Sequence, residues 1–146
     1  MKTVQLITDG ACIGNPGPGG WAYVLRFGEH YKEAYGCEPR TTNNRMELTA
    51  AVKGLEALKE PCSVTITTDS QYLKNGITSW IRRWRQNGWL TAAKQPVLNK
   101  DLWEALDREV RRHRAKWEWT KGHASHDDNN RCDELASMAA RQQRSS

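Results

Sequence analysis

The hydrophobic pattern changes its period near Asn44, and this change limits the folds open to the chain. Before Asn44, apolar and β-branched residues alternate with polar ones in short segments, a pattern that predicts strands. From Asn44 onward they recur three or four residues apart, which predicts a helix with one apolar face. Strands that are followed by helices alternating with further strands are typical of a mixed sheet with helices packed on it. The fold class expected from this order is α/β or α+β.

Five strands are predicted, three before the change of period and two after it. They cover Val4–Asp9, Trp21–Phe27, Tyr31–Gly36, Ser63–Thr68 and Lys116–Lys121. The sequence Gly28-Glu29-His30 predicts a hairpin turn between the second strand and the third. The first three strands are therefore expected to form an antiparallel meander.

Helices are predicted between and after the later strands. The first runs from Asn44 to about Lys59, where Glu60-Pro61 ends it. A helical region rich in Trp and Arg begins at Gln71, an amphipathic helix covers Asp101–His113, and a final helix follows the turn 122–128. The expected organisation is one domain over residues 1–142 and a short polar tail over 143–146, frayed at its end.

Composition and charge favour a polyanionic partner and argue against a membrane protein. The net charge is +5, and the stretch 80–100 has five basic residues and no acid. The amino terminus has no apolar run long enough for a signal peptide or a membrane span, so we expect a cytoplasmic protein. The four cysteines form no C-x-x-C pair, which gives no indication of a zinc or redox site.

Two aspartates occupy matching positions at the ends of predicted strands. Asp9 follows Thr8 at the end of the first strand, and Asp69 follows Thr68 at the end of the fourth. If these strands are neighbours, the two carboxylates meet at one end of the sheet, where a cation would relieve their repulsion. The alternative is that each aspartate only opens a turn, because Asp-Gly and Asp-Ser are common turn pairs.

Two further acids lie early in predicted helices. Glu47 shares a helix face with Ala51 and Leu55, so it is expected to point toward the sheet. Its spacing from Asn44 also fits a capping box. Asp133 borders the apolar side of the final helix, and the helix dipole alone would explain an acid there.

These acids lie within motifs through which the chain resembles the type 1 ribonuclease H family. The motifs are Thr8-Asp9-Gly10-Ala11-Cys12 with Gly14-Asn15-Pro16-Gly17-Pro18-Gly19-Gly20, Thr41-Thr42-Asn43-Asn44-Arg45-Met46-Glu47, Thr68-Asp69-Ser70-Gln71-Tyr72, Lys121-Gly122-His123 and Cys132-Asp133. They occur in the family's order and span roughly residues 2–141. The resemblance implies a five-stranded mixed sheet with helices on both faces.

The resemblance also implies an activity, hydrolysis of the RNA strand of RNA–DNA hybrids. Asp9, Glu47, Asp69 and Asp133 match the acidic tetrad that holds two Mg²⁺ ions, which Mn²⁺ is expected to replace. His123 matches a loop histidine that assists proton transfer or product release. Asn130 stands where many relatives carry Glu. The family's products carry a 5′-phosphate and a 3′-hydroxyl.

Further matching positions are expected to contact the hybrid. Small polar side chains suit the RNA strand because its 2′-hydroxyls distinguish it from DNA. The expected contacts are Cys12, Asn15, Asn43, Asn44 and Gln71 for the RNA strand and its groove, Arg40 and Thr42 for a phosphate of the DNA strand, and Trp80, Arg82, Arg83, Trp84, Arg85 and Trp89 for a basic handle. Without the resemblance, the asparagines suit turns or caps, and the tryptophans suit a core.

Three hypotheses remain distinguishable by experiment. The first is a monomeric hybrid-specific nuclease. The second is a noncatalytic nucleic-acid-binding module on the same fold, and the third is a relative that cuts other substrates, as integrases and resolvases do. Retention of all four acids and of His123 argues against the second, and the Asn-rich motifs with the handle argue against the third.

Overall fold

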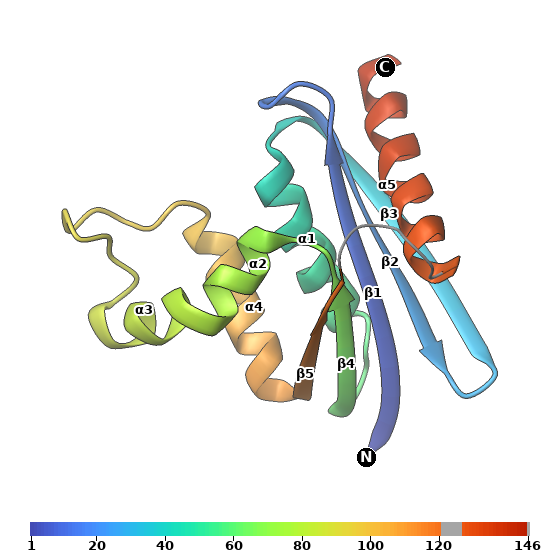
Figure 1. Ribbon diagram of the computed structural model, residues 1–146, viewed down its shortest axis with the longest axis horizontal. Helices are drawn as coiled ribbons and strands as arrows, with labels where there is room; N and C mark the ends of the chain where they lie inside the picture. Colours follow the sequence, from blue (N-terminus) through green and yellow to red (C-terminus); the bar gives the residue numbers. More distant parts are fainter. Residues whose placement is uncertain (121–126, 146) are drawn as a thin grey trace.

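The computed structural model describes residues 1–120 and 127–145, which form one sheet and its covering helices (Figure 1). The strands are β1 (Lys2–Cys12), β2 (Gly17–Phe27), β3 (His30–Thr41), β4 (Cys62–Thr68) and β5 (Arg114–Trp119). The helices are α1 (Asn43–Glu56), α2 (Gln71–Asn75), the π-helical turn η1 (Gly76–Trp80), α3 (Ile81–Asn87), α4 (Lys100–Arg112) and α5 (Asp127–Ser145). Of these helices, none is long and apolar enough to cross a membrane.

The sheet is mixed, with strand order β3-β2-β1-β4-β5. β1 is antiparallel to β2 and parallel to β4, and β4 is parallel to β5. β2 and β3 form the expected hairpin, in which Gly28 has a φ of 57°. The predicted meander and the five-stranded mixed sheet are confirmed.

Alternation along the central strands gives the sheet two apolar faces. Val4 and Leu6 of β1 pack in the core that α1 covers, whereas Ile7 packs against Cys132 and Leu135 of α5. Successive side chains of a strand point to opposite faces, so a single strand supplies both cores. Figure 1 shows α1 and α5 on opposite sides of the sheet. Helices therefore cover both faces, as expected.

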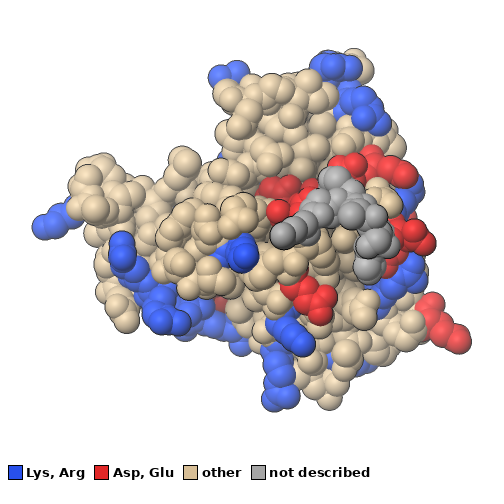
Figure 2. Space-filling view, viewed as in Figure 1, with Lys and Arg blue, Asp and Glu red and all other residues tan. Residues whose placement is uncertain are grey.

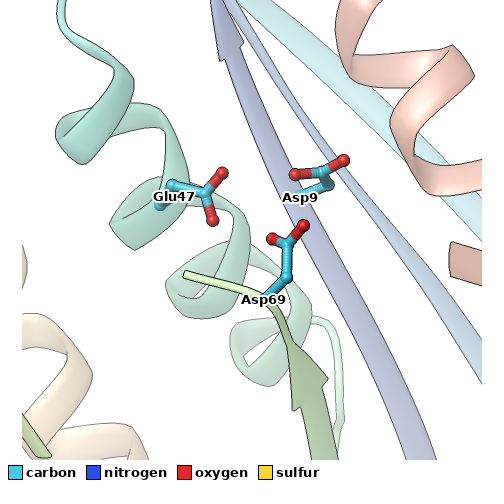
Figure 3. Close-up of side chains that lie close together, drawn as sticks. All are labelled: Asp9, Glu47 and Asp69. Atoms are coloured by element: carbon cyan, nitrogen blue, oxygen red, sulfur yellow. The ribbon is translucent and has the colours of Figure 1, made fainter. Parts of the chain in front are cut away.

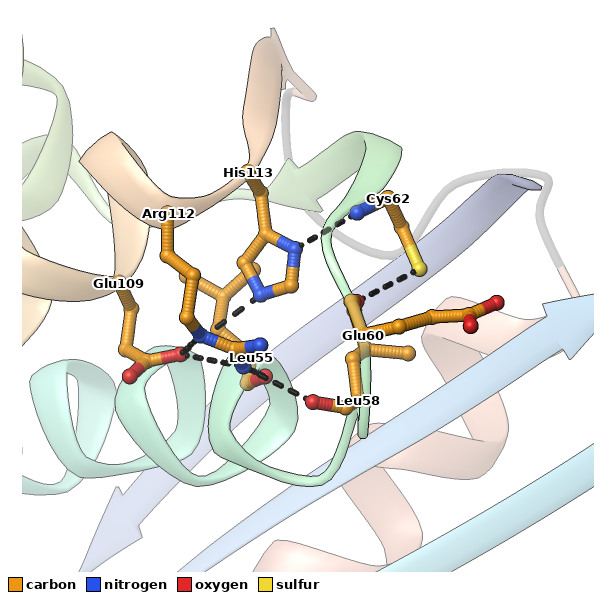
Figure 4. Close-up of polar contacts among 7 residues, drawn as sticks. All are labelled: Leu55, Leu58, Glu60, Cys62, Glu109, Arg112 and His113. Atoms are coloured by element: carbon orange, nitrogen blue, oxygen red, sulfur yellow. Dashed lines mark hydrogen bonds and ion pairs between the residues drawn. The ribbon is translucent and has the colours of Figure 1, made fainter. Parts of the chain in front are cut away.

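The C-terminal end of α1 is fixed by the junction between α4 and β5 (Figure 4). Arg112 donates hydrogen bonds to the carbonyl oxygens of Leu55 at 3.1 Å and Leu58 at 2.8 Å. His113 is buried, and its Nδ1 accepts the backbone N–H of Cys62 at 3.0 Å. Carbonyls at a helix end lack partners within the helix, so Arg112 supplies donors where α1 ends. This junction holds α1 against the sheet.

Several boundaries differ from the predictions. β1 continues to Cys12, so Asp9 lies inside a strand rather than at its end. The parallel pairing of β1 with β4 does end at Ile7, but antiparallel pairing with β2 continues through Cys12. α1 ends at Glu56, before the predicted Lys59, and α5 continues through Ser145 into the residues expected to form a frayed tail.

Candidate active site

Three carboxylates meet where β1, β4 and α1 converge (Figure 3). Asp9 comes from β1, Glu47 from α1, and Asp69 follows the last residue of β4. One oxygen of each lies within 4.8 Å of the others. Asp9 and Glu47 are 7% and 4% exposed, and Asp69 is the most exposed of the three. The expected convergence of these acids is present in the structure, just beyond the last residues at which β1 pairs with β4.

Glu47 is held in the site by a contact with β1. Its Oε1 accepts a hydrogen bond from the backbone N–H of Gly10 at 3.0 Å. A Cβ at Gly10 would lie 2.5 Å from the backbone nitrogen of Glu47, so a side chain there would push α1 away. The N-cap of α1 is Thr42, whose side chain accepts from the backbone N–H of Arg45. The capping-box interpretation of Glu47 from Asn44 is therefore wrong.

Burial and mutual repulsion disfavour the ionised forms of these acids. Burial, followed by the charge of Asp69, raises the pKa of Asp9 to about 7. Burial and the charges of Asp9 and Asp69 raise the pKa of Glu47 well above its ordinary value. The raised pKa values mean that burial and mutual repulsion make the ionised forms of Asp9 and Glu47 costly. A bound cation would lower that cost.

The donor set fits a hard divalent cation. Carboxylate oxygens are the ligands that Mg²⁺ and Mn²⁺ prefer. Glu47 Oε2 is buried and accepts no hydrogen bond from any residue in the described part of the chain. A buried acceptor without a donor is costly, and coordination to a cation would satisfy it. Asp9, Glu47 and Asp69 could therefore hold a divalent metal ion.

Asp133 also lines a cavity that contains the three acids. The cavity, about 380 Å³ in volume, is lined by Asp9, Gly10, Asn43, Asn44, Glu47, Asp69, Ser70, Gln71, Tyr72 and Asp133. We call it the acid cavity. Asp133 comes from α5 and is not a member of the three-acid group, although its charge contributes to the raised pKa of Asp9. His123 falls outside the described residues.

The expected RNA-contacting residues divide into two sets. Asn43, Asn44 and Gln71 line the acid cavity. Asn15 is tied to the start of α1, because its Oδ1 accepts the backbone N–H of Asn43 at 3.1 Å. The Cys12 sulfur lies within hydrogen-bonding distance of three backbone carbonyl oxygens, and its thiol can donate to the nearest, that of Gly14 at 2.8 Å.

Ser70 and Tyr72 also line the acid cavity, although the sequence did not single them out. Ser70 N-caps α2 by accepting from Leu73, and the Tyr72 hydroxyl accepts from Asn99 at 3.1 Å and Trp103 at 2.9 Å. The signal available in the sequence was their position directly after Asp69, at the start of a predicted helix. The side chains of Ser70 and Tyr72 therefore line the cavity and also form hydrogen bonds with residues outside its wall.

The expected phosphate-binding pair lies at the start of α1. Thr42 is the N-cap described above, so its hydroxyl already serves the helix. Arg40 is exposed near the end of β3. The two residues are close in sequence, and the helix N-terminus beside them favours an anion.

Residues 76–99, here called the protrusion, extend beyond the sheet (Figure 1). Trp80, Trp84 and Trp89 are half-buried in it and form a chain of ring contacts of 5.8 Å and 5.9 Å between centroids. Trp80 and Trp84 also pack against Trp103, which is fully buried. The rings therefore contribute to the core and remain partly accessible. Core packing of these tryptophans is thus compatible with a role in a basic handle that contacts the hybrid.

The three arginines of the protrusion have different surroundings. Arg82 and Arg83 are exposed, and Arg83 borders a cavity of about 310 Å³ with Trp80 and Trp84. Arg85 instead donates through Nε to Asp107 at 2.7 Å, where the carboxylate is buried. In Figure 2, basic side chains without acidic neighbours lie over the helical region on the left, whereas acidic side chains lie from the centre to the right edge of the view.

A buried group of carboxylates, a neighbouring polar wall and a basic aromatic extension are features expected of a cation-dependent enzyme that acts on a polyanion. The RNase H family model matches residues 1–141. The chain is 67% identical to a ribonuclease H of Solibacter usitatus and 59% identical to a ribonuclease HI of Neisseria meningitidis. The alignments cover 98% of both chains in the first case and 97% of both in the second.

Solved structures agree with this assignment. LC9-RNase H1, described as a type 1 RNase H with the type 2 active-site motif, superposes with a TM-score of 0.87 at 31% identity. The match covers 97% of this chain and 74% of that one. The chain belongs to the RNase H family.

Proposed function

We propose that this chain is an endonuclease that hydrolyses the RNA strand of RNA–DNA hybrids, independently of base sequence, with two Mg²⁺ ions. Mn²⁺ is expected to replace Mg²⁺. Membership of the RNase H family supports the substrate and reaction class. The observation that carries the metal requirement is the three-acid group, with carboxylate oxygens within 4.8 Å of one another.

The residues of the acid cavity have separable tasks in this proposal. Asp9, Glu47 and Asp69 hold the cations, and the Gly10 N–H fixes the orientation of Glu47. Asp133 completes the ligand set from α5. When bound, the cation pair supplies an activated water and stabilises the leaving 3′ oxygen, so that products carry a 5′-phosphate and a 3′-hydroxyl. His123 is proposed to assist proton transfer or product release.

Substrate recognition is proposed to use two surfaces. Asn43, Asn44 and Gln71 line the acid cavity and suit the 2′-hydroxyls of the RNA strand. Cys12 is the last residue of β1 and Asn15 lies in the loop that follows it, and Arg40 with Thr42 is proposed to bind a phosphate of the DNA strand. The protrusion is proposed to grip that strand through exposed arginines and accessible rings. A monomer and a cytoplasmic location remain expectations.

Cleavage of end-labelled duplexes tests the function. Wild-type protein is expected to cut the RNA of an RNA–DNA hybrid in Mg²⁺, to stop on addition of chelator, and to leave duplex DNA and duplex RNA intact. Binding of the hybrid without cleavage in Mg²⁺ or Mn²⁺ would indicate the noncatalytic module. Cleavage of duplex DNA instead of the hybrid would indicate a relative with other substrates.

A further inference from the structure

The helix that carries Asp133 packs on the sheet through large residues, such as Leu135 against Ile7, and through small ones that face β2. Gly20 of β2 lies under α5, and a Cβ there would be 2.3 Å from the carbonyl oxygen of Ala136. Ala22 and Ala139 are fully buried in the same interface. Small residues allow a close approach of helix to strand, but they give few interlocking ridges along the helix axis. Contacts at the first turns of α5 can therefore add to the packing of Leu135 on Ile7 in setting the register of the helix.

The first such contact joins β2 to the start of α5. Arg26 donates to the Asp128 carboxylate through Nε at 2.5 Å and Nη2 at 2.9 Å. Asp128 is only 6% exposed, and the Arg26 guanidinium also lies over the ring of Tyr31 at 4.7 Å from its centroid. A two-point hydrogen bond from a planar guanidinium restricts both distance and orientation.

The second contact joins β3 to the next turn of α5. Arg131 donates to the Glu33 carboxylate through Nε at 3.0 Å and Nη2 at 2.8 Å. Glu33 also accepts from the Tyr31 hydroxyl at 2.9 Å, so Tyr31 touches both ion pairs. We call the pairs Arg26 with Asp128 and Arg131 with Glu33 the α5 clamp.

We propose that the α5 clamp is a positioning device for the fourth carboxylate of the active site: it sets the axial position and rotation of α5 and thereby the place of Asp133 in the acid cavity. The proposal rests on the proposed function. Asp133 is two residues beyond Arg131 and five beyond Asp128 on the same helix. The other three acids are placed by β1, β4 and α1, whereas the backbone that carries Asp133 is that of α5.

Small errors in this placement are expected to matter for turnover. Catalytic groups need to be held within about 0.5 Å, and a displacement of about 1 Å can reduce rates by about a hundredfold. Among the described residues that line the acid cavity, none belongs to the clamp. The clamp residues are therefore positioning residues, which act on the reaction through Asp133.

Two single variants separate positioning from electrostatics. Arg131→Ala removes a positive charge near the acid cavity, whereas Glu33→Gln removes a negative one, and both break the same ion pair. If the clamp positions Asp133, both are expected to lower kcat by about tenfold with KM within about twofold. The double variant is expected to be no worse than the more affected single one, because the two residues act as a unit.

The matched control is Glu60→Gln, which breaks the exposed ion pair of Lys2 and Glu60, 3.2 Å long and remote from α5. It is expected to keep wild-type kcat. Changes of kcat in opposite directions in Arg131→Ala and Glu33→Gln would overturn the proposal, as would wild-type kcat in both. An equal loss in Glu60→Gln would also overturn it, since the effect would then not depend on α5.

Amide hydrogen exchange gives a readout that does not depend on activity. Both clamp variants are expected to exchange faster at residues 128–135 than the wild type, with unchanged exchange at Leu6 and Ile7 of β1. Unchanged exchange in α5 would overturn the clamp. Failure of the wild-type protein to cleave the hybrid would instead reject the proposed function, and the exchange result would then decide the clamp independently.

Discussion

The acid cavity and the protrusion are built on opposite physical principles. In the cavity, like charges are buried together and held by backbone contacts such as that of Gly10 with Glu47. In the protrusion, basic side chains such as Arg82 and Arg83 are exposed beside partly accessible rings. Under the proposed function, turnover would depend on fixed placement and on cations, whereas binding would depend on charge that salt can screen. The two regions should therefore respond to different perturbations.

The largest expected effect separates turnover from binding. Asp9→Asn keeps the shape of the side chain but removes a ligand and a charge, so single-turnover cleavage should fall by roughly a thousandfold or more. Affinity for the hybrid, measured by fluorescence anisotropy in chelator, should change by less than about threefold. Cleavage at the wild-type rate would remove Asp9 from the chemistry.

The next effect concerns the stability of the metal-free protein. The pKa of Asp9 is about 7 in the folded state, against an ordinary value of 3.8 for an unfolded chain. Protonation of Asp9 therefore favours the folded state, and this contribution to stability is fully present below pH 3.8. This contribution is lost as pH rises through about 7. Asp9→Asn should therefore be more stable than the wild type at pH 8, by on the order of 2 kcal/mol, and lose that advantage at about pH 4.

Urea unfolding in chelator at the two pH values measures this difference. Comparison with the variant at each pH cancels the contribution of His113, whose pKa is lowered by burial and whose effect has the opposite sign. Saturating Mg²⁺ should raise the free energy of unfolding of the wild type at pH 8, so that the wild type becomes more stable than Asp9→Asn. A variant equal to the wild type at both pH values would contradict the buried-charge account of the cavity.

A smaller effect is expected in the protrusion. Changing Arg82 and Arg83 to Ala together should weaken hybrid binding several-fold at low salt. The slope of log affinity against log salt concentration, here called the salt slope, should fall in magnitude by about 1 to 2, because up to two phosphate contacts are lost. The value of kcat should stay near that of the wild type. A salt dependence equal to that of the wild type would reject the protrusion as a phosphate-binding surface.

The smallest effect tests whether all basic residues of the protrusion act alike. Arg85 is paired with buried Asp107, so Arg85→Ala should lower the free energy of unfolding by about 1 kcal/mol and leave the salt slope unchanged. Anisotropy titrations over a salt series, run beside the Arg82 and Arg83 variant, make the comparison. A reduced slope in Arg85→Ala would show that Arg85 serves the hybrid after all.

The elements that the sequence predicted best are those marked by a local hydrophobic period. Alternating residues identified the strands, and Asp9 and Asp69 marked the place where the parallel pairing of β1 with β4 ends. β1 was nevertheless predicted to end too early, because residues 10–12 lack the large apolar side chains that signal a strand. They pair with β2 all the same.

Contacts between distant residues could not be inferred from period. No residue near Glu47 in the sequence indicates that its side chain contacts Gly10, 37 positions away. From the helix alone, a capping role for Glu47 and a position in the active site were therefore equally good interpretations. The pairs Arg26 with Asp128 and Arg85 with Asp107 are 102 and 22 positions apart and depend on the packing of whole elements. Motif resemblance named the acids, and the fold supplied the contacts that hold them.

The most direct test of the central claim is anomalous scattering from Mn²⁺ in crystals of the wild-type protein. A peak is expected among the carboxylate oxygens of Asp9, Glu47 and Asp69, which already lie within 4.8 Å of one another. An ordered Mn²⁺ elsewhere on the molecule, with the acid cavity empty at a concentration that supports cleavage, would contradict the claim that these acids bind the catalytic cations.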